Sequence, residues 1–251
     1  MSGEISLDEA ERLLKILTVE EIGTLAKIDV GREMRKGIPE VILAEGKRAE
    51  DVAQIALGML NEHGIAMISR AKIEQIEVIR MNVQGDVLFN ANEKVGTVVV
   101  RKKDFVIQST GGKVGILTAG TSDIPIAEEA KMIAEGMGCD VVTAYDVGVA
   151  GIHRLFPHLK AMLEKDVDVI IAVAGREGAL PSVVAGLVDI PVIGVPTSIG
   201  YGLGEKGIGA LTAMLQTCSL GLAVVNIDGG IPAGAIAALI ANRMAKIRGH
   251  G

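Results

Sequence analysis

The sequence predicts an α/β protein: a three-layer sandwich around a five-stranded parallel sheet, preceded by a small α+β domain. Two observations support this prediction. From residue 113 onward, short apolar runs alternate with segments of helical periodicity. Each of these apolar runs is followed by a glycine-rich turn that precedes the next helical segment. Such alternation produces right-handed βαβ crossovers, which place helices on both faces of a parallel sheet.

The first domain is predicted to cover residues 1–110. Ser6-Leu7-Asp8-Glu9 and Thr18-Val19-Glu20-Glu21 are capping boxes, and each predicts a helix, the second running through Lys27. A basic loop over residues 31–39 follows. The remaining predicted elements are a strand over 40–44, a helix over 49–63, a strand over 64–69, a short helix over 71–77 and a strand over 95–101.

Ser109-Thr110-Gly111-Gly112 is the predicted linker, and the second domain covers residues 113–251. Its predicted strands are 113–118, 140–144, 167–174, 191–196 and 222–227. Its predicted helices are 124–137, 152–164, 180–188, 206–216 and 233–246.

Composition agrees with strands that are buried on both faces. Hydrophobic residues make up 49% of the 251-residue chain, and its mean hydropathy is +0.42. The sequence nevertheless has no run of about 18 uninterrupted apolar residues, so no membrane-spanning helix is expected. Because Met1-Ser2-Gly3-Glu4 has no basic region followed by an apolar core, no secretory signal is expected. We therefore expect a cytoplasmic protein.

Charge and aromatic content disfavour nucleic acid as a partner. The chain has 31 acidic and 25 basic side chains, a net charge of −6, and only two tyrosines and three phenylalanines. A nucleic-acid-binding protein is expected to carry a basic stripe and stacking aromatics. The two cysteines, Cys139 and Cys218, lack the spacing and the histidine partners of a zinc site.

The glycine-rich turns predict where a ligand binds. In a parallel sheet such turns gather at the carboxyl ends of the strands, where ligands bind. Because glycine has no Cβ, backbone N–H groups there can approach an anion closely. We therefore expect a large, polar, phosphorylated ligand at this edge. The turns are residues 119–123, 146–151, 175–178, 198–204 and 228–230.

The first two turns offer acidic and hydroxyl side chains. Ser122-Asp123, which follows Gly120 and Thr121, either caps the next helix or holds a phosphate or ribose at its N-terminus. Asp146 and Asp123 are the candidates for a Mg²⁺ ligand beside a pyrophosphate, and the sequence does not choose between them.

Cationic side chains lie in the second and third turns. Arg154 is either a surface ion-pair residue or a guanidinium fork for phosphate or carboxylate, and His153 beside it is either structural or part of the site. Arg176-Glu177, which follows Gly175, either faces solvent or binds the ligand. In the second case Arg176 binds an anion, and Glu177 binds a hydroxyl group or a metal.

The carboxyl-terminal half resembles the AIR carboxylase family of purine synthesis, which implies a flavodoxin-like sandwich. The resemblance rests on Thr121-Ser122-Asp123, residues 179–187 and residues 191–197. Those carboxylases use the first turn to bind the ribose phosphate of their substrate. Ala179 stands where that family has a histidine, and its Ser-Ala-His-Arg motif has no counterpart in residues 147–150. The resemblance therefore implies the same fold with changed chemistry.

The whole chain resembles the LarB family more closely, the carboxylase/hydrolases that begin nickel-pincer nucleotide biosynthesis. This resemblance implies nicotinic acid adenine dinucleotide as substrate, CO₂ or bicarbonate as carbon source and Mg²⁺ as the metal. It also implies a homo-oligomer, an octamer by analogy. The matching segments are residues 37–42, 45–47, 119–123, 145–154, 202–207 and 214–218.

The LarB resemblance gives Cys218 the role of nucleophile, although free cysteines by themselves indicate packing. In the mechanism that this resemblance implies, the thiolate adds to the pyridinium ring, C5 then attacks CO₂, and water afterwards cleaves the phosphoanhydride to release AMP. Asp123, Asp146 and Glu177 are the right types of residue for the general base.

The position of Cys218 in the predicted fold creates a tension. A helix that starts at the carboxyl edge of the sheet ends at the opposite edge, so Cys218 is expected far from the turns of its own subunit. Either the helix is short or bent, or Cys218 serves a neighbouring subunit.

Two alternative functions remain open. One is an AIR carboxylase or mutase, which needs a histidine at the position of Ala179. The other is a non-catalytic nucleotide-binding protein of the same fold.

Overall fold

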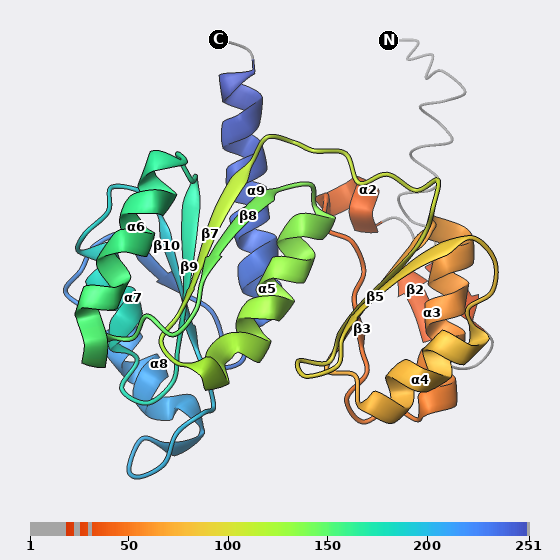
Figure 1. Ribbon diagram of the computed structural model, residues 1–251, viewed down its shortest axis with the longest axis horizontal. Helices are drawn as coiled ribbons and strands as arrows, with labels where there is room; N and C mark the ends of the chain where they lie inside the picture. The colour runs from red at the N-terminus through yellow and green to blue at the C-terminus, as the bar shows by residue number, and fades with distance from the viewer. Residues whose placement is uncertain (1–18, 23–25, 30–31, 250–251) are drawn as a thin grey trace, which may run out of the picture. The chain divides into compact units, whose positions relative to one another are not determined.

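The computed structural model describes residues 19–22, 26–29 and 32–249 (Figure 1). The chain divides into two compact units, Met1–Val106 and Ile107–Gly251. The boundary falls just ahead of the segment 109–112 that the sequence suggests as the linker. Within the described residues, no helix combines the length and the apolar character needed to cross a membrane.

The second unit is built on an all-parallel five-stranded sheet in the order β11-β10-β9-β7-β8, which confirms the predicted α/β class. Strands β7 and β9 are neighbours although β8 lies between them in sequence, so the crossovers change direction there. Open sheets bind ligands at such a switch point. The strands are β7 (Lys113–Thr118), β8 (Asp140–Ala144), β9 (Val169–Ala174), β10 (Val192–Pro196) and β11 (Leu222–Val224).

Helices cover both faces of this sheet (Figure 1). Helices α5 (Ile124–Gly136) and α9 (Gly230–Arg248) pack against each other on one face. The other face carries α6 (Leu155–Glu164), α7 (Ala179–Ala185) and α8 (Ile208–Leu215), whose apolar side chains join one buried cluster with the strands. Three short 3₁₀ segments connect strands to helices: η1 (Thr121–Asp123), η2 (Val149–Arg154) and η3 (Glu205–Gly207).

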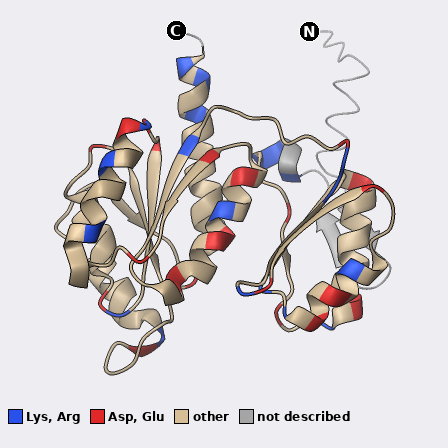
Figure 2. Ribbon diagram, viewed as in Figure 1, with Lys and Arg blue, Asp and Glu red and all other residues tan. Residues whose placement is uncertain are grey.

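The contact between α5 and α9 depends on small residues. A Cβ atom on Gly234 of α9 would lie 2.3 Å from the carbonyl oxygen of Ala130 in α5. Side chains that face away from this contact are charged and pair along their helix. On α5, Lys131 Nζ lies 4.0 Å from Glu135 Oε1, and Figure 2 shows basic and acidic residues alternating there. Such pairs stabilise a helix only weakly.

The central strands are buried on both faces, as their apolar sequences predict. All six residues of β9 and all five of β10 are buried. The sheet therefore forms a rigid support for the turns at its carboxyl edge. The predicted helix over 152–164 differs in one respect: its beginning is the 3₁₀ segment η2, and α6 starts at Leu155.

The first unit contains a four-stranded sheet in the order β3-β4-β6-β5, with helices α3 and α4 packed together. Helix α3 has the predicted bounds, and it is capped by Gly64, whose φ of 75° is left-handed. The elements are α2 (Arg32–Lys36), β3 (Ile42–Leu43), α3 (Ala49–His63), β4 (Ile65–Ser69), α4 (Ile73–Asn82), β5 (Val87–Asn92) and β6 (Thr97–Lys102).

Two predictions for this unit are wrong, and one strand was not predicted. Where a helix from Thr18 through Lys27 was predicted, the described residues form two antiparallel strands, β1 (Val19–Ile22) and β2 (Ala26–Asp29). Cross-strand pairing there overrides the capping-box signal, and β-branched residues favour strands. The predicted basic loop contains α2, and the sequence reasoning missed β5. The helix predicted from Ser6 lies outside the described residues.

Candidate functional site

A pocket of about 420 Å³ opens at the carboxyl edge of the parallel sheet, at the switch point between β7 and β9. The turns that follow β7, β8, β9 and β10 line it, the last through Ile199, together with the start of α7. The structure thus brings four of the predicted turns into one cavity. Six predicted site residues line the pocket: Gly120, Ser122, Asp123, Gly175, Arg176 and Glu177.

Glycines allow the backbone segments of this pocket to approach one another. A Cβ atom on Gly148 would lie 2.5 Å from the carbonyl oxygen of Ala119, and one on Gly175 would lie 2.4 Å from that of Ile199. Side-chain carbons do not approach oxygens this closely without a backbone shift. Backbone thus forms the pocket wall at these two glycines, and such backbone suits an anionic ligand.

The Asp123 carboxylate is buried, with 4% of the residue exposed, and protein groups donate hydrogen bonds to both of its oxygens. The Thr197 hydroxyl donates to Oδ1 at 2.7 Å, and the Gly120 N–H donates to Oδ2 at 2.9 Å. Burial raises the pKa of the Asp123 carboxyl group, while the bonds from Thr197 and the backbone oppose this rise. Asp123 thus connects the turn after β7 to the end of β10 and positions both.

Asp146 and Arg154 bind each other. Arg154 Nη1 lies 2.6 Å from Asp146 Oδ2, and the two side chains are 42% and 48% exposed. The Asp146 N–H donates to Thr118 Oγ1 at 3.0 Å, which fixes a residue whose φ is 57°. Neither residue lines the pocket. The pair shapes the second turn, and an exposed ion pair of this kind contributes little to stability.

Arg176 stands at the mouth of the pocket with a left-handed φ of 51°. Its guanidinium carbon lies 4.0 Å from the centroid of the Tyr201 ring, within the range of a cation–π interaction. A second hollow of about 600 Å³ adjoins the first, because Arg176 and Glu177 line both. The third turn therefore forms the border between two cavities.

Besides Asp146 and Arg154, three more predicted site residues do not line the pocket. Thr121 and His153 are exposed in η1 and η2. Cys218 is also exposed and lies between the end of α8 and the start of β11. Because β11 runs parallel to β10, that loop lies at the amino edge of the sheet, opposite the pocket. One chain by itself does not bring Cys218 to Asp123.

Sequence reasoning assigns no role to Thr197 or Tyr201. Thr197 follows β10 and is fully buried, which its sequence neighbours do not reveal. Tyr201 had a signal, since it is one of five aromatic residues and lies in a glycine-rich turn.

The predicted site residues do not form a protein cage for Mg²⁺. Among the residues that the structure describes, no three His, Cys, Asp or Glu side chains converge on a metal position. Asp123 accepts hydrogen bonds on both oxygens, and Asp146 faces Arg154. Both candidate carboxylates thus have protein donors as partners, Asp123 on both oxygens and Asp146 on Oδ2.

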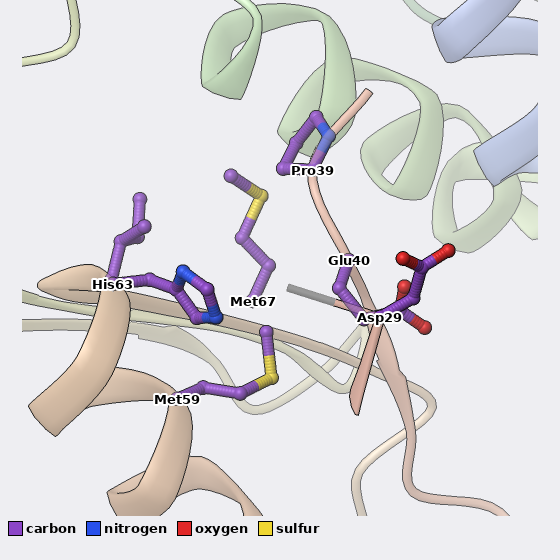
Figure 3. A pocket seen from close by; sticks show the side chains of 7 residues that line it. Asp29, Pro39, Glu40, Met59, His63 and Met67 are labelled. Atoms are coloured by element: carbon purple, nitrogen blue, oxygen red, sulfur yellow. The ribbon is translucent and has the colours of Figure 1, made fainter. Parts of the chain in front are cut away.

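The first unit holds a separate small hollow, in which Figure 3 shows Met59, His63 and Met67 side by side. Its volume of about 20 Å³ is enough for about one water molecule and excludes a nucleotide. Asp29 at its border is paired with Arg35, whose hydrogen bond lowers the pKa of Asp29.

The fold and the pocket define an α/β protein with a cavity at the carboxyl edge of a parallel sheet. Residues 113–249 match the family model of AIR carboxylase, and residues 19–102 match that of the LarB/PurE-like N-terminal domain. The chain belongs to the AIR carboxylase family. The added N-terminal domain confirms the resemblance to LarB proteins.

The similar proteins include one from Methanocaldococcus jannaschii, an uncharacterized protein 51% identical over 249 residues, 98% of this chain and 95% of the relative. The N5-carboxyaminoimidazole ribonucleotide mutase of Thermotoga maritima is 31% identical over 129 residues, 50% of this chain and 66% of the relative. The same enzyme of Vibrio vulnificus is 31% identical over 145 residues, 54% and 87% respectively. Family members are carboxylases and mutases, which supports an enzyme of the carboxylase type.

Proposed function

We propose that this protein carboxylates C5 of the pyridinium ring of nicotinic acid adenine dinucleotide and hydrolyses its phosphoanhydride. The products are pyridinium-3,5-biscarboxylate mononucleotide and AMP. The observation that carries the proposal is the composition of the carboxyl-edge pocket. Its turns suit a phosphorylated ligand, but its described lining includes no histidine, and Ala179 occupies the start of α7. The pocket thus lacks the imidazole that the mutases place there.

The pocket is proposed to hold the mononucleotide half of the substrate. We propose that the phosphate lies against the glycine-rich backbone at Gly148 and Gly175, and that the Ser122 hydroxyl, which lines the pocket, binds phosphate or ribose. Asp123 keeps the first turn in position through its bonds to Gly120 and Thr197.

Carbon–carbon bond formation needs an electron-rich ring, which a pyridinium is not. In the proposed step the Cys218 thiolate adds to a ring carbon and forms a C–S bond, giving a dihydropyridine whose C5 is nucleophilic. C5 then attacks CO₂, a base removes the C5 proton, and the C–S bond breaks with its electron pair returning to sulfur. One inaccessible step becomes several feasible ones.

The proposal requires that Cys218 comes from a second copy of the chain. Within one chain, helix α8 runs from the pocket edge to the opposite edge, where the thiol is exposed. Leu215 and Leu220 flank Cys218 and are 65% and 91% exposed. Exposed apolar side chains of this kind are typical of a subunit contact. We therefore propose a homo-oligomer, with an octamer as the expected size.

For the hydrolytic step we propose Glu177 as the general base that activates water. Of the three carboxylates of the right type, Glu177 both lines the pocket and is exposed. Asp123 and Asp146 are hydrogen-bonded to protein groups, and we assign them positioning roles. Mg²⁺ enters the proposal only as a counterion that accompanies the pyrophosphate of the substrate.

The direct test is mass spectrometry of the products formed from nicotinic acid adenine dinucleotide, ¹³C-bicarbonate and Mg²⁺. We expect AMP and a mononucleotide that has gained one labelled carboxyl group, with Cys218→Ala inactive and Cys139→Ala, which removes the other cysteine, active. Unchanged dinucleotide would refute the proposal. Turnover of N5-carboxyaminoimidazole ribonucleotide in a parallel assay would favour a mutase instead.

Mixed oligomers test the shared site. Cys218→Ala and Glu177→Ala chains are each expected to be inactive alone, and subunit exchange is expected to restore activity. A site that combines the pocket of one chain with the thiol of the other is then intact. No recovery in verified mixed oligomers would contradict the second-copy arrangement.

A further inference from the structure

We propose that Arg176 and Tyr201 form a stacking platform for the purine base of a nucleotide, in the hollow beside the carboxyl-edge pocket. The inference rests on the proposed function, because a dinucleotide has a second ring that the first pocket does not hold. It assigns that ring to a site of its own, with Tyr201 as a binding residue.

The second hollow has the size and position for half of a dinucleotide. It lies between the turn after β10 and the beginning of α8, and its volume is about 600 Å³. Arg176 and Glu177 line this hollow and the first pocket alike, so a ligand can extend from one to the other past these two side chains. Each volume is within the range of small-molecule sites.

Tyr201 is placed as a platform. It is 78% exposed, although the Arg176 guanidinium carbon lies 4.0 Å from its ring centroid. Arg176 Nη1 also donates to the Tyr201 carbonyl oxygen at 3.4 Å, so the same cation holds both the ring and its backbone. Nucleobases stack on exposed aromatic rings and on guanidinium planes.

The turn that carries Tyr201 is held at its base and open at its tip. At the base, a Cβ atom on Gly204 would lie 3.0 Å from the Cα atom of Gly209 in α8. At the tip, Gly202 has a left-handed φ of 85°, and a Cβ atom there would meet nothing within 4 Å. The ring is therefore anchored to the hollow but not covered by its own chain.

The rest of the hollow provides apolar walls and polar groups. Leu203 and Ile208 are exposed apolar side chains, the first fully and the second 58%, and a base lying on Tyr201 would cover such surface. Thr212 and Glu177 line the same space, and the Glu177 carboxylate is an acceptor for a ribose hydroxyl.

The test measures the binding of AMP and of nicotinic acid mononucleotide separately, by calorimetry on the full-length protein. Tyr201→Ala is expected to raise the Kd for AMP about 5- to 150-fold, the range for loss of one stacked base. Tyr201→Phe keeps the ring and should bind AMP like the wild type. The mononucleotide should bind all three proteins equally. Phe156→Ala, at the other exposed aromatic residue, is the control and should bind AMP normally.

The outcomes separate this inference from the proposed function. Tyr201-dependent AMP binding without turnover of the dinucleotide would support the platform and refute the proposed function. Turnover of the dinucleotide with an unchanged KM in Tyr201→Ala would support the proposed function and refute the platform. Equal AMP affinity in all variants, or no AMP binding by the wild type, would overturn the platform. So would dissociation of the oligomer by Tyr201→Ala with normal AMP affinity, since Tyr201 would then be a subunit contact.

Discussion

The hydrogen bond between Thr197 and Asp123 offers a sharp test of how the site is held together. Replacing Thr197 by valine keeps the volume of a fully buried side chain and removes the donor to a carboxylate that is 4% exposed. A hydrogen bond to a charged group contributes about 1.5–3 kcal/mol, against about 0.5–1.5 kcal/mol for a neutral one. We therefore expect Thr197→Val to lower the free energy of unfolding at pH 7 by about 1.5–3 kcal/mol.

The pH dependence of this loss follows from the raised pKa of Asp123. A carboxyl group whose folded pKa lies above its unfolded value binds more protons when folded, so it lowers stability as pH rises from its unfolded pKa through its folded pKa. The Thr197 bond favours the charged form, and its removal raises the folded pKa further. The loss in Thr197→Val should therefore be largest at neutral pH and shrink as Asp123 becomes protonated.

The assay is urea unfolding at fixed protein concentration from pH 4 to pH 7.5, with Thr118→Val as the matched control. Thr118 is equally buried, but its hydroxyl accepts a bond from the neutral Asp146 N–H, so its loss should not vary with pH. The slope with denaturant should stay constant, so that midpoints report stability. Equal losses in both variants at every pH would show that the Asp123 carboxylate does not depend on Thr197.

Three further predictions concern other parts of the second unit. Burial raises the pKa of the Cys139 thiol to about 11. An alkylating reagent at pH 8 should therefore modify only Cys218 of the two cysteines in the folded protein, and both in urea. Peptide mapping reads the labelled sites, and early labelling of Cys139 would contradict its burial. Gly175→Ala should reduce substrate affinity and lower the free energy of unfolding by about 1–3 kcal/mol, because the new Cβ would lie 2.4 Å from the Ile199 carbonyl oxygen. An unchanged KM and melting temperature would show that the turn moves to accommodate the methyl group. Arg248→Met should lower the free energy of unfolding by about 1–2 kcal/mol, because the Asp168 side chain, 3% exposed, loses its cationic partner. The loss is moderate because the Arg248 side chain is itself 36% exposed. The melting temperature in low and in high salt checks this prediction, and no shift in either condition would refute it.

The sequence predicted elements best where local signals agree. Helix α3 has its predicted bounds because its apolar spacing stops at Gly64, a residue suited to a left-handed cap. Strands β7 and β8 also match, since each is a short apolar run that ends at a turn. The strand pair of β1 and β2 was mispredicted because a capping box is a local signal, whereas strand pairing depends on a partner segment.

The sequence predicted the location of the candidate site better than the contacts between its side chains. Parallel strands must gather their glycine turns at one edge, so the convergence of Gly120, Gly148 and Gly175 follows from the βα alternation. The partners of individual side chains do not follow from it. Asp123 binds Thr197, 74 residues away in sequence, and Arg176 lies over Tyr201, 25 residues away. Sequence patterns do not fix such pairs, because each depends on the packing of a whole layer.

The sequence by itself determined the α/β class, the order of the strands and helices in the second unit, the edge at which the ligand turns meet and the family resemblance. These properties follow from hydrophobic periodicity, from glycine positions and from motifs that are local in the chain. Tertiary structure alone decided that Asp123 is a buried link, that Asp146 and Arg154 satisfy each other, and that Cys218 lies at the far edge of its own sheet. These contacts join segments that are distant in sequence and meet only when the sheet assembles. The burial and the electrostatic environment of each side chain therefore depend on residues from other segments.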